Sequence, residues 1–148
     1  MLALVRGEDG TKGKPSGMRE VQALFDQLEE GDFGIFAHSV NLAEVFYDIL
    51  GTDGRAVAEA TIADFQEAGL IERSDLDGAF WREVAELVAF RRGMSRDPAR
   101  PDWVPRLALG DAFGAALANR LNAEFVTADR TEIEPMHNVG KVAAQFIR

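Results

Sequence analysis

Cysteine is absent from the 148-residue chain, and histidine occurs only at His38 and His137. Without thiols the chain can form neither a disulfide framework nor a thiolate metal site, and two histidines are too few for a structural zinc site. No apolar run approaches the roughly 20 residues that a membrane span needs. The opening Met1-Leu-Ala-Leu-Val5 meets polar residues too soon for a signal peptide. We therefore expect a cytoplasmic protein without a membrane segment.

Basic residues are also in deficit, since 16 Lys and Arg face 25 Asp and Glu and give a net charge of −9. This balance argues against non-specific duplex binding, which depends on neutralising phosphates. It suits either a hard-cation site built of carboxylates or a basic protein partner. Residues 91–106 are the exception, because five arginines there face two aspartates. That stretch is either a solvated surface or a nucleic-acid contact.

The pattern of apolar residues predicts an α/β fold. Helical spacing occurs in the ranges 18–31, 41–51, 55–68, 80–92 and 109–121. Short apolar runs at 34–37, 70–71, 124–127 and 142–147 predict strands, and the polar segment after 127 predicts a turn. Strands that alternate with helices indicate a parallel sheet covered on both faces. With a hydrophobic content of 47%, we expect one soluble domain over residues 1–148.

Three acidic residues lie just past a predicted strand or at the start of a helix: Glu44, Asp111 and Asp129. Open parallel sheets bind ligands beyond the carboxyl ends of their strands. Because clustered carboxylates raise one another's pKa, a group of acids without basic partners is best explained by a divalent cation. Carboxylate oxygens suit Mg²⁺ or Mn²⁺. The sequence thus predicts a site for one of these ions.

Each acid also has a structural interpretation. Asn41-Leu-Ala-Glu44 fits a capping box. Asp111 fits a helix N-cap or a first-turn acid. Asp129, before Arg130, fits a turn residue with a local ion pair. Their shared placement at one end of a sheet is what favours the metal site.

The segments around these acids resemble the acidic motifs of the PIN family, and in particular its VapC toxin branch. The second, third and fourth motifs correspond in order and spacing to Asn41-Leu-Ala-Glu44-Val, Leu109-Gly-Asp111-Ala and Val126-Thr-Ala-Asp129-Arg. The ending Phe146-Ile-Arg148 resembles the family's last strand, so the likeness covers nearly all of the chain. It implies a PIN-like three-layer α/β/α sandwich whose parallel sheet has the strand order 3-2-1-4-5.

The resemblance also implies a function, namely an Mg²⁺- or Mn²⁺-dependent endoribonuclease that hydrolyses RNA phosphodiester bonds. Such a protein would be the toxin of a toxin–antitoxin pair, bound by a cognate antitoxin and commonly a homodimer. Carried over, Glu44, Asp111 and Asp129 would be metal-binding and catalytic, and Thr127 would be a supporting hydroxyl. His38 is expected to be a strand-end residue rather than a ligand. Three arginines are the candidates for RNA contacts: Arg91, Arg92 and Arg96.

The family's first strand, which ends in an aspartate, has no clear counterpart. Leu2-Ala-Leu-Val-Arg-Gly-Glu8 resembles the stretch that follows that aspartate. A late annotated start is the explanation we favour, and it predicts that the DNA upstream encodes a short apolar strand with an Asp. The others are a degenerate copy, or a substitution by Leu2 to Val5 with Glu8 or Asp9 as the acid. Because that strand is central in the implied order, its absence leaves neighbouring strands with unpaired backbone groups.

Two other classes of function follow from the sequence. The first is a binding or oligomerisation module with a PIN-like fold that has lost its chemistry, which the missing strand supports. The second is a paired-carboxylate glycosidase, which we set aside because nothing places two acids beside aromatic sugar platforms. Trp81 is expected in the core of its helix, and Trp103 lies in a proline-rich loop.

Overall fold

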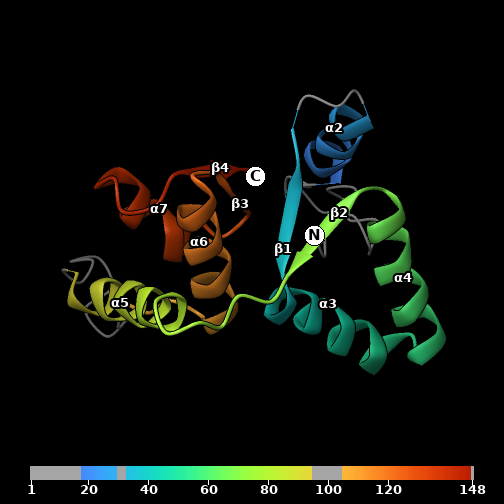
Figure 1. Cartoon of the computed structure of the whole chain (residues 1–148), viewed down its shortest axis with the longest axis horizontal. Coiled ribbons are helices and arrows are strands. Elements are labelled where there is room, and N and C mark those ends of the chain that lie inside the picture. Colours follow the sequence, from blue (N-terminus) through green and yellow to red (C-terminus); the bar gives the residue numbers. More distant parts are fainter. Residues whose placement is uncertain (1–17, 30–32, 95–104, 148) are drawn as a thin grey trace. The chain divides into compact units, whose positions relative to one another are not determined.

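The structure is a computed structural model that describes residues 18–29, 33–94 and 105–147. The chain divides into two compact units, which are described separately (Figure 1). Unit 1 comprises Met1–Ser74 with Ile147–Arg148, and unit 2 comprises Asp75–Phe146. Both contain helices and short parallel strands, so the α/β class is confirmed. A single domain over 1–148 stays a prediction, and Trp103 lies outside the described residues.

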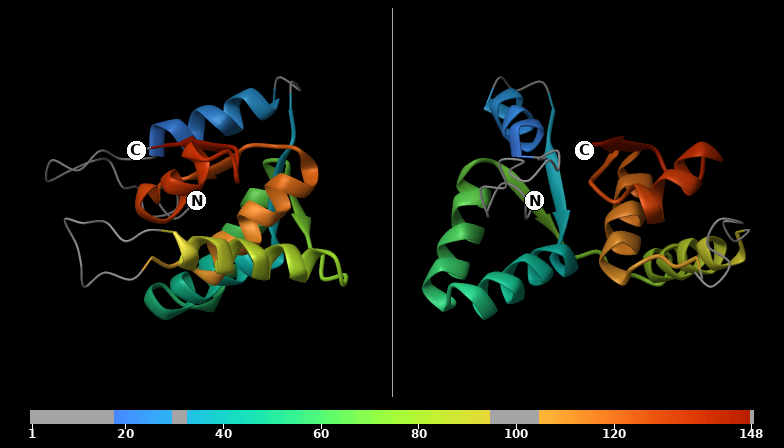
Figure 2. Two further views of the ribbon diagram at one scale, coloured as in Figure 1. Left: turned by 90° about the vertical axis from the view of Figure 1, so that its left-hand side faces the viewer. Right: turned by 180° about the vertical axis from the view of Figure 1, so that it is seen from behind.

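Unit 1 is built on one pair of parallel strands. Its elements are α2 (Met18–Glu29), β1 (Ile35–His38), α3 (Ser39–Thr52), α4 (Arg55–Glu67) and β2 (Leu70–Arg73). In the pair, Ile35 lies opposite Leu70. Parallel strands need a long crossover, and here α3 leads away from the end of β1 while α4 returns to β2 (Figures 1 and 2). Phe25 of α2 stacks on Phe65 of α4 and so fixes α2 to this crossover.

The start of α3 differs from the predicted capping box. His38, the last residue of β1, is buried, and its Nδ1 accepts a hydrogen bond of 3.1 Å from Val40 N. The imidazole is therefore the N-cap, which confirms His38 as a strand-end residue. Because the helix begins at Ser39, Asn41 lies inside it and Glu44 lies in its second turn. The predicted capping box at Asn41 was wrong, because Asn41 lies inside the helix and His38 is its N-cap.

One face of the unit 1 sheet is uncovered. Phe36 and Ile71 are register partners, and they are 39% and 47% exposed. Parallel sheets usually have both faces covered. The described residues of unit 1 therefore leave an apolar sheet face open.

Unit 2 also contains one pair of parallel strands. Its elements are α5 (Phe80–Gly93), α6 (Leu109–Leu121), β3 (Phe125–Thr127), α7 (Arg130–Asn138) and β4 (Ala144–Phe146). Phe125 lies opposite Ala144 in the pair. Three helices, the segments just before α6 and β4, and the start of β4 bury one core: Phe80, Val84, Leu87, Leu107, Ala112, Ala115, Ala116, Leu117, Ile133, Met136, Val142 and Ala144.

Helix α7 stands where the sequence predicted a turn. Its residues are polar and it contains Pro135, which is why the helical pattern is weak. It buries Ile133 and Met136, three residues apart on one face. Its first turn is capped by Asp129, whose carboxylate accepts a hydrogen bond of 2.9 Å from Glu132 N. Tertiary packing and this cap therefore override the unfavourable composition.

The buried face of α5 differs by one position from the predicted one. Phe80, Val84, Leu87 and Arg91 are the buried residues of this helix. Trp81 follows Phe80 and so points about 100° away around the helix axis. It is 51% exposed, with the Arg82 guanidinium 4.8 Å from its ring centroid. The expectation that Trp81 belongs to the core was wrong.

A single parallel sheet covered on both faces stays a prediction for the described residues. Their strands form two separate two-stranded parallel sheets, β1–β2 and β3–β4. No strand in the described ranges joins the two pairs. None of the described helices is both long and apolar enough to cross a membrane.

Gly114 allows α6 to lie close to β3, and this contact gives a first prediction. A Cβ at Gly114 would lie 2.5 Å from the Phe125 ring. We expect Gly114→Ala to lower the free energy of unfolding by about 1–3 kcal/mol. Gly93→Ala is the matched control in the same unit, because nothing lies within 4 Å of its added Cβ; it should change stability by less than about 0.5 kcal/mol. Urea unfolding followed by circular dichroism measures both, and equal stabilities would contradict the packing argument.

Candidate metal centre

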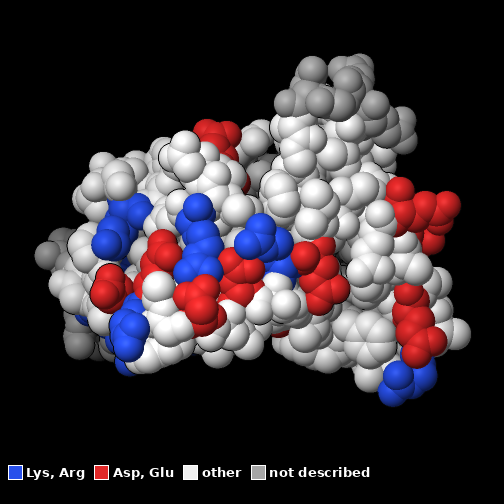
Figure 3. Space-filling view, in the orientation of Figure 1, with Lys and Arg blue, Asp and Glu red and all other residues white. Residues whose placement is uncertain are grey.

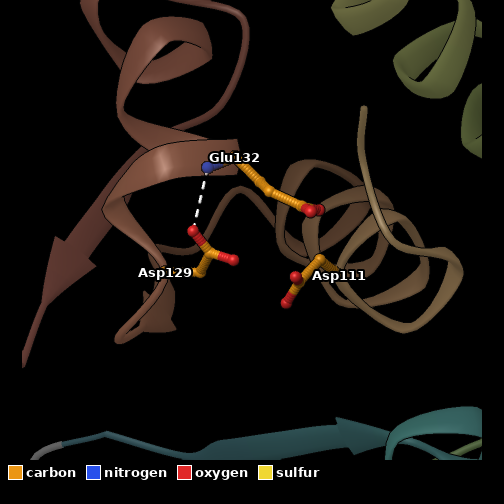
Figure 4. A group of neighbouring side chains, drawn as sticks. All are labelled: Asp111, Asp129 and Glu132. Atoms are coloured by element: carbon orange, nitrogen blue, oxygen red, sulfur yellow. Dashed lines mark hydrogen bonds between the residues drawn. The ribbon is translucent and has the colours of Figure 1, made fainter. Parts of the chain in front are cut away.

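Three carboxylates gather in unit 2: those of Asp111, Asp129 and Glu132. One oxygen from each lies within 4.8 Å of the others. Asp111 comes from the first turn of α6, while Asp129 caps α7 and Glu132 lies in the first turn of α7. Their side chains face a common space (Figure 4). The sequence predicted Asp111 and Asp129, and the structure brings these two together.

Glu132 was missed because residues 130–138 were interpreted as a turn and a polar segment. The usable signal was the spacing of Asp129 and Glu132, which is that of a capping box. Half of that motif forms, since Asp129 accepts from Glu132 N. The Glu132 carboxylate does not return to Asp129. It reaches instead toward the segment before α6.

Thr127 fixes the turn that presents Asp129. Its side chain is buried at the end of β3, and its hydroxyl oxygen accepts a hydrogen bond of 3.0 Å from Asp129 N. Because Asp129 is thereby held at both its backbone and its carboxylate, the end of β3 and the start of α7 form one rigid corner. Thr127 thus supports the backbone of Asp129. The expectation that its hydroxyl lies near a metal stays a prediction.

The acids have basic neighbours, which the sequence argument did not expect. Glu132 accepts a hydrogen bond from Ala108 N through one oxygen, and its other oxygen lies 3.3 Å from Arg106 Nε. Burial lowers the pKa of Arg91, and the nearby carboxylates of Glu132 and Asp129 oppose that shift. The premise of an acid group without basic partners is therefore corrected. The Glu132 carboxylate thus has two protein partners, Ala108 N and Arg106.

Arg91 has a structural role in place of the expected RNA contact. It is 2% exposed, and its guanidinium donates hydrogen bonds of 2.9 and 3.0 Å to the carbonyl oxygens of Thr131 and Glu132. This burial argues against a contact between Arg91 and RNA. Arg92 is exposed, so its RNA contact stays a prediction, and Arg96 lies outside the described residues.

One face of unit 2 carries charges of both signs. On the face shown in Figure 3, basic and acidic side chains alternate over α5. In unit 2, Arg120 of α6 pairs with Asp75 at 2.9 Å and with Asp77 at 2.6 Å. The hydrogen bond from Arg120 holds the pKa of Asp77 well below its usual range, with help from the backbone N–H groups of α5. Over α5, this face therefore offers no continuous basic path for a nucleic acid.

Glu44 stays a prediction as a metal ligand. It lies on α3 of unit 1, outside the group formed by Asp111, Asp129 and Glu132. Its side chain is partly buried, and this burial raises its pKa. The alternative acids Glu8 and Asp9 lie outside the described residues.

The chemistry of the grouped donors fits a hard cation. All are carboxylate oxygens, the ligands that Mg²⁺ and Mn²⁺ prefer, and the described residues add no histidine to the group. Comparisons with protein-family models, curated proteins and solved structures found no match to this chain. The geometry of unit 2 and the motif resemblance therefore carry the functional interpretation.

The buried guanidinium of Arg91 gives a second prediction. We expect Arg91→Met to lower the free energy of unfolding by about 2–4 kcal/mol, because the buried hydrogen bond to the Glu132 carbonyl and the part-buried one to the Thr131 carbonyl are both lost. Arg92→Met changes the exposed neighbouring residue and should cost less than about 0.5 kcal/mol. Chemical denaturation followed by circular dichroism compares the two variants. If Arg91→Met were as stable as Arg92→Met, the hydrogen bonds from Arg91 to α7 would not contribute to stability.

Proposed function

We propose that this chain is a PIN-like, metal-dependent endoribonuclease that hydrolyses RNA phosphodiester bonds. The observation that carries the proposal is the grouping of Asp111 and Asp129, which were selected from sequence motifs and are 18 residues apart by their numbers. Two separate helix starts deliver them to one place in unit 2. Independent motif residues that meet in this way are expected of a binding site.

The strand pairings also support a PIN-like fold. The order 3-2-1-4-5 places the second strand beside the third, and the fourth beside the fifth. If β1 to β4 are the second to fifth strands, the pairs β1–β2 and β3–β4 are those two neighbours, both parallel as the order requires. The first strand of that order would lie between the second and the fourth. The three-layer sandwich itself remains part of the proposal.

The proposed chemistry is hydrolysis at phosphorus. A water oxygen forms a bond to phosphorus, one ester P–O bond breaks, and the departing oxygen takes up a proton. Asp111 and Asp129 would hold Mg²⁺ or Mn²⁺, which when bound supplies the charge that activates water and stabilises the departing oxygen. The role of the protein is to hold those two carboxylates in position. Thr127 and the capping bond to Glu132 N hold Asp129 in position before any ligand binds.

The proposed biological setting is that of a cytoplasmic toxin with a cognate antitoxin, acting as a homodimer. The net charge of −9 suits a basic partner protein. Unit 1 also exposes Tyr47 of α3 and Val57 of α4, two large apolar side chains of a kind that protein interfaces use. These features support an association without identifying the partner.

Replacing one ligand carboxylate gives a third prediction. Asp111→Asn keeps the size of the side chain but removes its charge, so we expect Mn²⁺ affinity to fall by at least about tenfold and metal-dependent RNA cleavage to be lost. Asp64→Asn, at an exposed site on α4, is the matched control and should match the wild type in both. Calorimetric titration with Mn²⁺ and cleavage of a fluorogenic RNA, with and without EDTA, measure the outcome. An unchanged cleavage rate in Asp111→Asn would refute the proposed site, and Glu44→Gln tests the remaining implied ligand.

The second candidate function is a PIN-like binding module without catalysis. It is favoured by the partners of Glu132, because Arg106 and Ala108 N already stabilise that carboxylate without a metal. Such a module would bind Mn²⁺ weakly or not at all, and EDTA would leave its interactions unchanged. The same titration therefore separates the two candidates.

A further inference from the structure

Arg106 lies beside the acidic group and is open to solvent. Its Nε lies 3.3 Å from the Glu132 carboxylate, yet 77% of its side chain is exposed. A guanidinium carries five N–H donors, and the contact with Glu132 uses the one at Nε. In the described part of the chain, no acceptor is paired with the terminal nitrogens at the far end of this side chain.

The backbone around Arg106 is fixed. Pro105 and Leu107, on either side, are buried, and the next residue, Ala108, donates its N–H to Glu132. Glu132 therefore holds both the side chain and the following backbone of Arg106. A side chain held in this way loses less conformational entropy when it binds a ligand.

Other arginines of unit 2 are occupied by protein groups. Arg120 is held between Asp75 and Asp77, and Arg130 pairs with Glu134 at 3.0 Å. Arg91 is buried against α7. Arg106 thus has an exposed side chain, a backbone held in place by its neighbours, and a position next to the candidate metal centre.

We propose that Arg106 is a positioning residue that binds a backbone phosphate of the RNA next to the phosphodiester at Asp111 and Asp129. This inference rests on the proposed function. The planar guanidinium matches two phosphate oxygens in a fork-like contact. Contacts to phosphate set the register and affinity of a nucleic acid without reading its sequence. Arg106 therefore supplies affinity close to the acids, where repulsion of the RNA backbone is greatest.

The test measures RNA binding separately from chemistry. Fluorescence anisotropy with a labelled single-stranded RNA, in EDTA and from 50 to 200 mM salt, gives affinity without cleavage. We expect Arg106→Gln to raise Kd about 5–20-fold and to reduce the slope of log K against log salt by about 0.7, the value for one lost phosphate contact on a single strand. Arg55→Gln, an exposed arginine of unit 1 that also pairs with a glutamate, is the control and should match the wild type.

Further readouts separate a phosphate contact from a structural role. Arg106→Lys keeps the charge but not the fork, so its Kd should lie between those of the wild type and Arg106→Gln, with an unchanged thermal unfolding midpoint. In Mn²⁺, Arg106→Gln should raise KM more than it lowers kcat. A Kd and salt slope for Arg106→Gln equal to those of Arg55→Gln would overturn this inference. Failure of the wild type to bind Mn²⁺ would instead refute the proposed function, while the EDTA binding data would still test Arg106.

Discussion

The arrangement of unit 2 depends on which donors form hydrogen bonds with the carbonyl groups at the start of α7. Pro135 has no N–H, so the carbonyl of Thr131, four residues earlier, loses its usual helical donor. The hydrogen bond to this carbonyl is part-buried, and a carbonyl removed from water without a donor is costly. Arg91 of α5 supplies the missing donor at 2.9 Å and binds the next carbonyl, that of Glu132, through Nε. A helix that its own composition does not favour is therefore completed by a side chain 40 residues earlier.

The same short helix, α7, contacts both α5 and the segment before α6. Through its backbone, α7 binds Arg91, and through the Glu132 side chain it holds the segment before α6. Asp111 follows that segment directly, and Asp129 begins α7. The distance between the two acids is thus set by groups that need not touch any ligand. This explains why arginines accompany an acidic group, since they fix its geometry as well as lower its charge repulsion.

Sequence reasoning located most elements because their apolar periodicity is local. It failed at α7, whose stability comes from Arg91 and from buried Ile133 and Met136, contacts that a local pattern does not contain. It found Asp111 and Asp129 from their motifs, but missed Glu132 together with the helix that carries it. It treated Arg91 and Arg92 alike as basic residues. What separates them is that Arg91 lies on the buried face of α5, which the sequence pattern did not show. Burial and long-range hydrogen bonds were the missing information.

The capping role of Asp129 limits how a cation can be held. One of its oxygens accepts from Glu132 N, and both oxygens of Glu132 have protein partners. Asp129 would therefore offer a cation one carboxylate oxygen rather than a bidentate pair. A cation bound there would keep water in most of its coordination sphere, which suits the small, strongly hydrated Mg²⁺ better than Ca²⁺ with its six to eight oxygen ligands. In the proposed site, the hydrogen bond that begins α7 would thus favour a strongly hydrated ion.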